Sequence, residues 1–425
     1  MNFLHKEHPS REILLSVLLF FLLLGLLTFG LHSLTLNNNL GSDYYIYYLA
    51  GRALFIDHQN PYGDQVAQQV QMAVYKHLAG PNEDQLGFAY PPYALLPALP
   101  TFWLSFDWAQ ALWISLNLLV LMSLIYLAFP QAPKWATVSV LFIYPFSFAL
   151  ILGNFNLLVT AFLILAYGIL IKDRPLSRPL QAGLGLLLAW STVKPQFMWL
   201  FLVFLLASAW RRRLWVLLAS FTAASLLLLG FSFAVMPTWP VAWYDRLVKY
   251  TGYNQTWLIL TFFLKEVMSL QLATVITTLA GVVCAALTVW LFYRWWKGGV
   301  SDLLMMAWCG FVIFLFHPRG KAYEHILFLL PILLWICQKR KRPGWAVWVF
   351  WFGSLVMSWL IFILSRQPGA SPLLSETPFF LFVGWMAWLF VSEHRSARKP
   401  STGLPPRPGR LVKTGEIDQS SSLRV

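Results

Sequence analysis

Charge is scarce in this sequence of 425 residues: only 11% of them are Asp, Glu, Lys or Arg, whereas 58% are hydrophobic. A soluble domain usually has about 25% charged residues and cannot hide this much apolar surface in one core. The apolar residues form long runs, and residues 13–36 and 214–235 contain no Asp, Glu, Lys or Arg. A helix needs roughly 20 apolar residues to cross a bilayer. We therefore predict an all-α, polytopic membrane protein.

Acidic residues are the rarest charged type, with 17 against 31 basic residues and a net charge of +14. The basic clusters lie at the ends of apolar runs, at residues 211–213, 339–342 and 395–399. This is the positive-inside pattern of cytoplasmic loops. A groove for nucleic acid would instead group the cations on one folded face. We therefore expect membrane lipids, and no nucleic acid, as partners.

Cysteine and the common nucleotide motifs are also nearly absent. Cys284, Cys309 and Cys337 lie in apolar segments at no metal spacing, which predicts buried thiols rather than disulfides. The chain has no Walker loop, no Gly-x-Ser-x-Gly and no Gly-x-Gly-x-x-Gly, so nucleotide chemistry inside the cell has no support. The first apolar run lacks a small-residue cleavage site, and we expect it to be an uncleaved span.

The apolar runs predict about 12 spans in residues 1–393, with both termini inside. Residues 394–425 are polar and rich in Pro and Ser, which predicts a disordered cytoplasmic tail. Residues 37–89 form the longest polar stretch before that tail and are expected outside. Two amphipathic pieces in it, 42–56 and 63–79, predict juxtamembrane helices, with a cluster of four tyrosines between residues 44 and 48 at the membrane interface.

The number of apolar pieces between this outer loop and the basic loop at 172–178 does not match the expected topology. Four apolar pieces lie between them, at residues 91–106, 109–129, 136–151 and 155–171. Passing from outside to inside takes an odd number of crossings, so one short piece is expected to be broken or re-entrant. Such backbone is tolerated only where protein or a water-filled cavity surrounds it. The sequence therefore predicts a cavity here.

Polar residues collect on the predicted outer side. Ionisable groups at membrane depth cost about 2.5 to 3.5 kcal/mol each on insertion scales and usually line a functional cavity. The outer-side set consists of Asp43, Asn154, Asn156, Lys194, Asn254, Gln255, His317, Arg319, Lys321, Glu324 and His325.

Asp43 and Lys194 each have two interpretations. Asp43 follows Gly41 and Ser42 at the start of a predicted helix, where Asp is a favoured N-cap; alternatively, it is a general base for an acceptor hydroxyl. Lys194 lies between two apolar runs. It either extends along the helix to the interface, as long cationic side chains do, or binds a lipid-linked phosphate at that depth.

The turn from His317 to Lys321 is unusually basic for an outer loop. Arg319 and Lys321 oppose the positive-inside rule, and an anion is their natural partner. His317 and His325 are eight residues apart, with no Asp-x-Asp pair and no Cys/His set, so we predict no bound metal.

Three further polar or aromatic motifs have a structural as well as a functional interpretation. Tyr90 opens an apolar piece before two prolines, which is typical of a stiff helix start. Asn154 and Asn156 mark a break between apolar runs, where an amide can hydrogen-bond a sugar or the backbone. Asn254 and Gln255 fit either an ordinary outer loop or a substrate contact.

Taken in order, the short motifs of the chain resemble glycosyltransferase family 87. They are Asp43, Asn60-Pro-Tyr62, Tyr90-Pro-Pro92, Gly153-Asn-Phe-Asn156, Lys194-Pro195, Asn254-Gln255 and His325. The resemblance runs from about residue 40 to 335. It departs at Gly153-Asn-Phe-Asn156, where the family is expected to have Gly-Gln-x-Asn, and the turn at 317–321 is more basic than expected.

This resemblance is to a family that includes mannosyltransferases. It implies a GT-C membrane fold and inverting transfer of a sugar, expected to be mannose, from a polyprenyl-phosphate donor to a lipid or glycan acceptor. It implies an active site on the outer side of a bacterial cytoplasmic membrane, no cofactor and a monomer. The implied roles are general base for Asp43, donor-phosphate binding for Lys194, Arg319, Lys321 and His325, and substrate binding for Tyr90, Asn154, Asn156, Asn254, Gln255 and His317. A transporter or flippase for a polyprenyl-linked glycan is the alternative; it would commonly show inverted repeats, which the sequence lacks. A purely structural scaffold is third.

Overall fold

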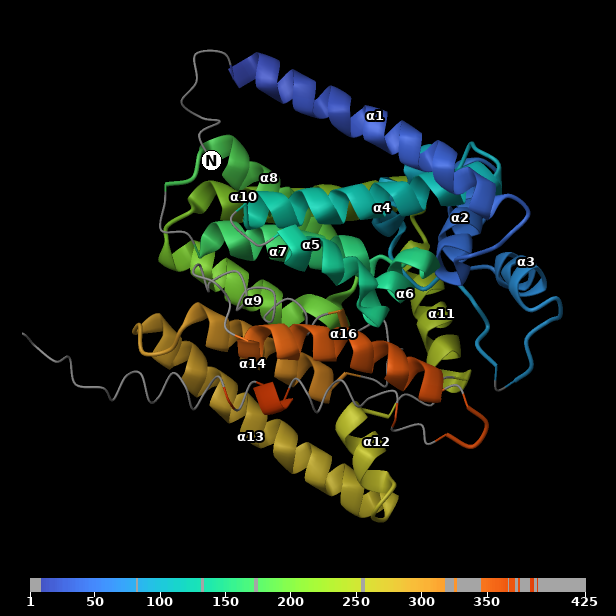
Figure 1. Cartoon of the computed structure of the whole chain (residues 1–425). Helices are drawn as coiled ribbons and strands as arrows, with labels where there is room; N and C mark the ends of the chain where they lie inside the picture. The colour runs from blue at the N-terminus through green and yellow to red at the C-terminus, as the bar shows by residue number, and fades with distance from the viewer. Residues whose placement is uncertain are drawn as a thin grey trace, which may run out of the picture.

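The structure is a computed structural model, which describes residues 9–81, 83–130, 134–171, 175–253, 257–317, 325–326, 345–365, 367–370, 374, 383–385 and 388. The regular elements in this part of the chain are helices (Figure 1). In chain order they are α1 Pro9–Thr35, α2 Ser42–Phe55, α3 Asp64–Val74, the 3₁₀ helix η1 Pro92–Thr101, α4 Phe106–Ala128, α5 Lys134–Ser139, η2 Val140–Phe142, α6 Tyr144–Leu152, α7 Asn156–Leu170, α8 Arg178–Ser191, α9 Pro195–Arg211, α10 Trp215–Val235, α11 Trp239–Tyr253, α12 Ile259–Lys265, α13 Leu270–Trp296, α14 Asp302–Leu315 and α16 Trp345–Ser365.

Long apolar helices with apolar outer surfaces confirm a membrane-embedded protein. In the described residues, four helices are long and apolar enough to cross a bilayer: α1, α4, α10 and α13. Only 6% of the apolar window of α1 is buried within the protein, and such a surface is stable only against lipid. Shorter apolar stretches in α7, α9, α14 and α16 accompany them. The count of 12 spans stays a prediction.

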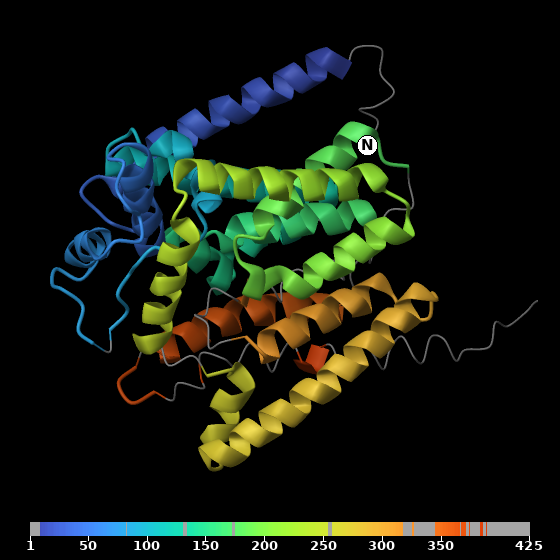
Figure 2. The same ribbon diagram turned by 180° about the vertical axis from the view of Figure 1, so that it is seen from behind.

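The long helices run side by side, and the polar helices lie across one end of the bundle. α4, α7 and α9 lie in neighbouring layers, α8 packs on α10, and α14 packs on α9 (Figure 1). α2, α3 and α11 gather at the right-hand end of the bundle in Figure 1, and the view from behind in Figure 2 shows the same end. The two ends of the bundle therefore differ. One end has the crosswise helices α2, α3 and α11, and the other has the connections α9–α10 and α13–α14.

The predicted break in the 91–171 region is confirmed. Residues 92–101 form a 3₁₀ helix with Pro97 and Pro100 inside it, and 136–151 is divided among α5, η2 and α6. Proline removes a backbone donor and ends regular helix, which explains η1. These broken pieces lie between α2 and α7 in the chain, and they frame the site described below.

The tyrosines of α2 differ from the prediction. We expected them at the membrane interface, but Tyr44, Tyr47 and Tyr48 are buried in the protein core. Burial is tolerated because each phenol needs only one partner: Tyr44 donates to Oγ1 of Thr101 at 2.6 Å and Tyr48 to the carbonyl of Leu104 at 2.7 Å. α2 is thus a core element, not a helix lying on the bilayer.

The remaining fold predictions have mixed outcomes. The chain directly before Asn254 and Gln255, which we expected in an outer loop or at the substrate, forms the helix α11. Cys284 and Cys309 are buried free thiols, as predicted, and Cys337 lies outside the described residues.

Candidate functional site

Asp43 faces another segment of the protein instead of capping its own helix. It lies in the first turn of α2, whose N-cap is Gly41, and no side-chain capping bond is formed there. Its Oδ2 accepts a hydrogen bond from Nδ2 of Asn154 at 2.5 Å. The side chain is 9% exposed. The N-cap interpretation of Asp43 is therefore wrong, although a negative charge in a first turn is still favoured by the helix dipole.

Asn154 forms hydrogen bonds to both Asp43 and Lys194. Its Oδ1 accepts from Nζ of Lys194 at 3.0 Å and from the backbone N–H of Asn156 at 2.9 Å, while its Nδ2 donates to Asp43. Exchanging the amide oxygen and nitrogen would point N–H groups at two donors, so the network fixes the orientation. The carboxylate and the ammonium are held on either side of one amide, and Asn154 itself is 1% exposed.

Lys194 is buried, not extended toward solvent. It is 3% exposed and lies at the N-cap position of α9, directly before Pro195. Its Nζ is 5.6 Å from the ring centroid of Tyr90, within the range of a cation–π contact. The interface interpretation of Lys194 is therefore wrong. The cation is instead placed between an aromatic ring and an amide oxygen, next to the start of a helix.

A left-handed glycine places Asn154. Gly153 ends α6 at φ +67°, a conformation that side chains with Cβ rarely adopt. Its carbonyl accepts from Nε1 of Trp113 at 2.8 Å. A Cβ at residue 153 would lie 2.6 Å from Cβ of Tyr44 and 2.8 Å from Cδ1 of Trp113. The sharp turn between α6 and α7 therefore depends on glycine.

A glutamine in an apolar helix places Asp43 in the same way. Oε1 of Gln110 accepts from the backbone N–H groups of Leu40 and Gly41, at 2.8 and 3.1 Å, and its Nε2 donates to the carbonyl of Asn38 at 2.9 Å. A Cβ on Gly41 would lie 2.6 Å from the carbonyl oxygen of Ile151. The start of α2 is thereby held directly against the end of α6.

Aromatic rings form the wall beside these polar groups. Tyr47 and Phe155 stack at 3.9 Å, and Tyr90 meets both rings edge-on at 5.6 and 5.5 Å. Burial raises the pKa of Tyr44 well above its usual range, so its phenol stays protonated and donates to Thr101. The wall thus places aromatic surface directly beside the polar groups.

The segment that carries Tyr90 is held by α11. Nε1 of Trp243 donates to the carbonyl of Ala89 at 3.0 Å, and the guanidinium of Arg246 fills the place where a side chain at Gly87 would be. The phenol of Tyr62 donates to the carbonyl of Tyr90 at 2.8 Å. We call residues 87–90 the strap.

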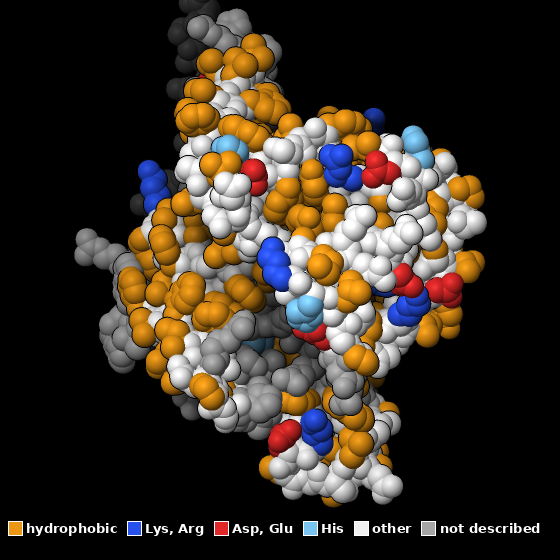
Figure 3. Space-filling model, turned by 90° about the vertical axis from the view of Figure 1, so that its right-hand side faces the viewer, with side chains coloured by type: hydrophobic (Ala, Val, Ile, Leu, Met, Phe, Trp, Pro, Cys, Tyr) orange, Lys and Arg blue, Asp and Glu red, His pale blue; other side chains and the backbone are white. Residues whose placement is uncertain are grey.

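Two basic side chains of α11 pair with one carboxylate of α3. Arg246, 4% exposed, pairs with Asp64 of α3 at 3.2 Å, and Lys249 pairs with the same carboxylate at 2.9 Å. In Figure 3, which views this end of the bundle, charged side chains of both signs lie scattered among apolar ones, and the surface is hollowed beside them. The face thus has no single large patch of one sign in this view.

The remaining predicted residues are only partly described. His317 and His325 are buried; the carbonyl of His317 accepts from Ile259 at 3.0 Å, and the ring of His325 lies 5.0 Å from Phe314. Arg319, Lys321, Asn254 and Gln255 lie outside the described residues. Among the residues that the structure covers, no three His, Cys, Asp or Glu side chains group as metal ligands, and metal independence stays a prediction.

Sequence reasoning missed Gln110 and Trp113. Both lie in the apolar run 109–129, and Gln110 is a fully buried amide there. A polar side chain inside a predicted span is the signal that identifies it. Trp113 offers no such signal, because a tryptophan in an apolar run is ordinary.

A buried chain of carboxylate, amide and ammonium groups lies at one end of an all-helical, membrane-embedded bundle. This arrangement defines the class of polytopic membrane enzymes with an intramembrane or juxtamembrane site. Within it, the sequence model of Glycosyltransferase family 87 matches residues 88–318. The chain belongs to this family and is a membrane glycosyltransferase. No curated protein and no solved structure matches the chain. Asn154 and Lys194 lie within the matched residues and Asp43 lies before them, so the hydrogen bond to Asn154 is what links Asp43 to the family region.

Proposed function

We propose that this protein transfers a sugar, mannose by the family resemblance, from a polyprenyl-phosphate donor to a hydroxyl of a glycolipid or glycan acceptor. The observation that supports it is the buried chain Asp43–Asn154–Lys194. A buried ion costs several kcal/mol unless other groups compensate it. Two opposite charges that are held apart by one amide contribute little to stability. They suit a reaction in which a proton is removed at one atom while negative charge develops at another.

The proposed reaction is a single displacement with inversion. The Asp43 carboxylate accepts the proton of the acceptor hydroxyl, whose oxygen forms a bond to C1 of the sugar. The bond from C1 to the phosphate oxygen breaks, and its electron pair stays on the polyprenyl phosphate. Lys194 stabilises that developing charge. A phosphate is a competent leaving group without protonation, so one carboxylate is sufficient.

Asn154 has a separate role in this proposal. If Asp43 and Lys194 formed a direct ion pair, the carboxylate would be neutralised as a base and the ammonium as a phosphate ligand. The interposed amide gives each group a hydrogen bond while keeping them apart. Asn154 is thus a positioning residue for both charges.

The neighbouring groups suit a sugar. The side-chain amide of Asn156 is fully buried, and within the described residues neither its oxygen nor its nitrogen has a hydrogen-bond partner. An unsatisfied buried amide costs about 1–3 kcal/mol, which a sugar hydroxyl would recover. Tyr90 and its aromatic wall provide an apolar surface for the ring. In this proposal Arg319, Lys321 and His325 add to the phosphate site, and His317, Asn254 and Gln255 to the substrate site.

The proposed setting is the outer side of a bacterial cytoplasmic membrane, with the protein as a monomer. The basic residues 211–213 lie at the opposite end of α9 from Lys194, which supports placing Asp43 outside by the positive-inside rule. A membrane-impermeant maleimide tests this in whole cells. Labelling of Asp57→Cys without lysis, and of Arg213→Cys only after lysis, is expected; the reverse pattern would contradict the proposed side.

The decisive assay uses purified protein, radiolabelled polyprenyl-phosphate mannose and a lipid acceptor pool. Asp43→Asn retains the shape and the hydrogen bond to Asn154 but cannot accept a proton, so transfer should fall about 10²- to 10⁴-fold. Asp57→Asn, an exposed carboxylate just after α2, is the matched control and should transfer at the wild-type rate. Equal product from the Asp43→Asn variant and wild type would remove Asp43 from catalysis.

A further inference from the structure

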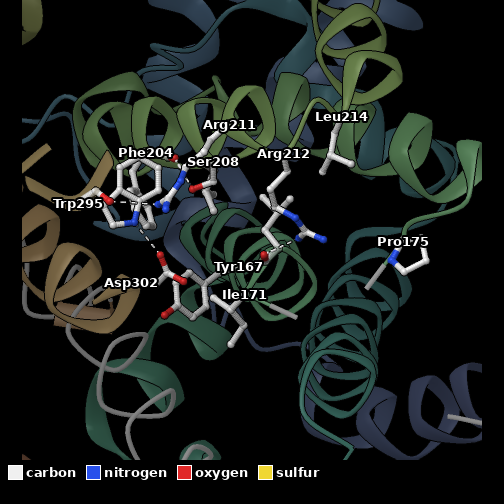
Figure 4. A pocket seen from close by; sticks show the side chains of 12 residues that line it. Tyr167, Ile171, Pro175, Phe204, Ser208, Arg211, Arg212, Leu214, Trp295 and Asp302 are labelled. Carbon is white, nitrogen blue, oxygen red and sulfur yellow. Dashed lines mark hydrogen bonds between the residues drawn. The ribbon is translucent and has the colours of Figure 1, made fainter. Parts of the chain in front are cut away.

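A cavity lies at the other end of the helices that carry the site. α7 begins at Asn156 and ends at Leu170, and α9 follows Lys194 and ends at Arg211. Seventeen residues of α9 rise about 25 Å, so the two regions are separated by the thickness of the bundle. The cavity has a volume of about 720 Å³ (Figure 4). It is lined by Tyr167, Leu170, Ile171, Pro175, Phe204, Leu205, Ser208, Arg211, Arg212, Leu214, Trp295 and Asp302.

The cavity has a cationic rim. Arg211 is exposed; its Nη1 donates to the carbonyl of Trp295 at 3.1 Å, and its guanidinium carbon lies 5.2 Å from that indole ring. A guanidinium has five N–H donors, and among the described residues Arg211 uses one. Asp302, the acid of the cavity, accepts from Nε1 of Trp295 at 2.7 Å, and the described ion pairs include none between it and Arg211. Trp295 thus contacts both Asp302 and Arg211, and these two side chains form no ion pair with each other among the described residues.

The wall formed by α7 and α9 is mostly apolar, with the Tyr167 phenol and the Ser208 hydroxyl as its polar groups. Tyr167, Leu170, Phe204 and Leu205 are all buried side chains of α7 and α9, and Figure 4 shows Tyr167 and Ile171 on the side facing the arginines. The cavity therefore combines a charged mouth at the end of the spans with an apolar interior along them. That is the pattern of an amphiphile: an anionic headgroup and a hydrocarbon chain.

We propose that this cavity binds a phosphate-bearing membrane lipid, with the phosphate on Arg211 and Arg212 and one hydrocarbon chain along the Tyr167–Leu205 wall. Arginine suits phosphate because its planar fork donates two parallel hydrogen bonds. This site is separate from the proposed catalytic site and does not depend on the function proposed for it.

Helix capping explains only part of the arrangement. Nη1 of Arg212 donates to the carbonyl of Leu170 at 2.5 Å, which caps α7, and arginine is favoured at a helix C-terminus. Arg211 does not need a cavity or an indole ring to cap α9. The apolar wall favours a lipid over free phosphate, because inorganic phosphate gains nothing from Phe204 or Leu205.

Direct lipid binding, measured by native mass spectrometry of the delipidated full-length protein, tests the inference. All variants carry Lys194→Met, so that a phosphate at the proposed catalytic site does not contribute. Phosphatidylglycerol, phosphatidylcholine and a polyprenyl phosphate are titrated separately, with inorganic phosphate as competitor. Arg211→Gln with Arg212→Gln should weaken binding of the anionic lipids about tenfold or more. Arg213→Gln removes the same charge from the next residue, which does not line the cavity, and should bind as the parent does.

The arms distinguish the sources of the phosphate. Tight binding of both anionic lipids indicates a general phospholipid site, and tight binding of polyprenyl phosphate alone indicates an isoprenoid site; both support the inference. Equal loss in the Arg213→Gln variant, binding of phosphatidylcholine as tight as that of the anionic lipids, or full displacement by inorganic phosphate would overturn it. Arg211→Lys, which keeps the charge, checks folding and should retain part of the binding.

Discussion

The charged side chains at the two ends of α7 and α9 have opposite environments, one buried and one exposed. At the Asn156 and Lys194 end, the cation is 3% exposed and hydrogen-bonded to a buried amide that also holds a carboxylate. At the Leu170 and Arg211 end, the arginine is exposed and lies on an indole ring. The first arrangement holds a carboxylate and an ammonium by hydrogen bonds to one amide, whereas among the described residues Arg211 uses one of its five guanidinium donors. The difference separates a site built for positioned chemistry from one built for holding a headgroup.

The same difference appears in what supports each end. The Lys194 end is held by Gly153, Gln110 and Trp113, whose contacts would not tolerate an added methyl group or a lost hydrogen bond. The other end rests on long side chains that can rearrange. Substitutions should therefore have large effects at the first end and graded effects at the second.

After Asp43→Asn, the largest effect is expected for Lys194→Met, which keeps the length of the side chain but removes its charge. Loss of one charge-stabilising donor at a reacting oxygen typically costs 10²- to 10³-fold in rate, and we expect a fall in kcat of that size in the radiolabel transfer assay. Arg213→Gln removes one positive charge at the other end and should leave kcat unchanged. Equal losses in both variants would show that net charge, not the position of Lys194, matters.

A smaller effect on activity and a large one on stability is expected for Gly153→Ala. The residue would need φ +67° and its Cβ would collide with Tyr44 and Trp113, which together cost about 2–4 kcal/mol. The melting temperature in detergent should fall by several degrees. Gly183→Ala in α8, where an added Cβ meets nothing, is the control and should melt at or slightly above the wild-type temperature. An unchanged melting temperature for Gly153→Ala would show that the α6–α7 turn is loosely held.

The helical, membrane-embedded class of the protein could be predicted from sequence because lipid selects composition so strongly. Asn154, Asn156 and Lys194 interrupt apolar runs, and such interruptions are costly enough to indicate function. The break in residues 91–171 followed from parity alone, and the family was identified from the order of short motifs. These predictions depend on local composition and on counting, which sequence contains.

What sequence did not contain is which groups meet across the bundle. The hydrogen bond from Asn154 to Asp43 joins residues 111 positions apart, and no local pattern indicates that the carboxylate faces an amide and not its own helix end. The tyrosines of α2 show the same limit, because a Tyr-rich amphipathic helix has the same composition at a membrane interface as in a core with phenol acceptors. The cavity at Arg211 could likewise not be predicted, because a basic cluster at the end of a span indicates only how that span is oriented in the membrane.

A moderate effect is expected for the strap. Gly87→Ala places a methyl group where the Arg246 guanidinium lies, so the arginine must move and the strap loses one of its supports. Small displacements remote from the chemistry can reduce rates by up to about 10²-fold, and we expect about a tenfold lower kcat with a nearly unchanged melting temperature, because a flexible side chain can relocate. Gly80→Ala lies in the same connection, where an added Cβ meets nothing, and should match wild type. Wild-type kcat for Gly87→Ala would show that Tyr90 keeps its place without Arg246.

The smallest effect concerns the ion pairs of α3 with α11. The hydrogen bond from Lys249 holds the pKa of Asp64 below its ordinary value of 3.8, with further lowering by the charges of Lys249 and Arg246. Because the folded pKa is lowered, the stabilisation is fully present above pH 3.8 and is lost as the pH falls through the folded pKa. Asp64 is 61% exposed, so solvent screening limits the contribution to less than about 1 kcal/mol. Asp64→Asn should therefore melt slightly below wild type at pH 7, and the gap should close below pH 3.8. Asp57→Asn, exposed and with no ion pair among the described residues, should show no gap at either pH. A gap for Asp64→Asn that persists at low pH would mean that the carboxylate acts through packing and not through its charge.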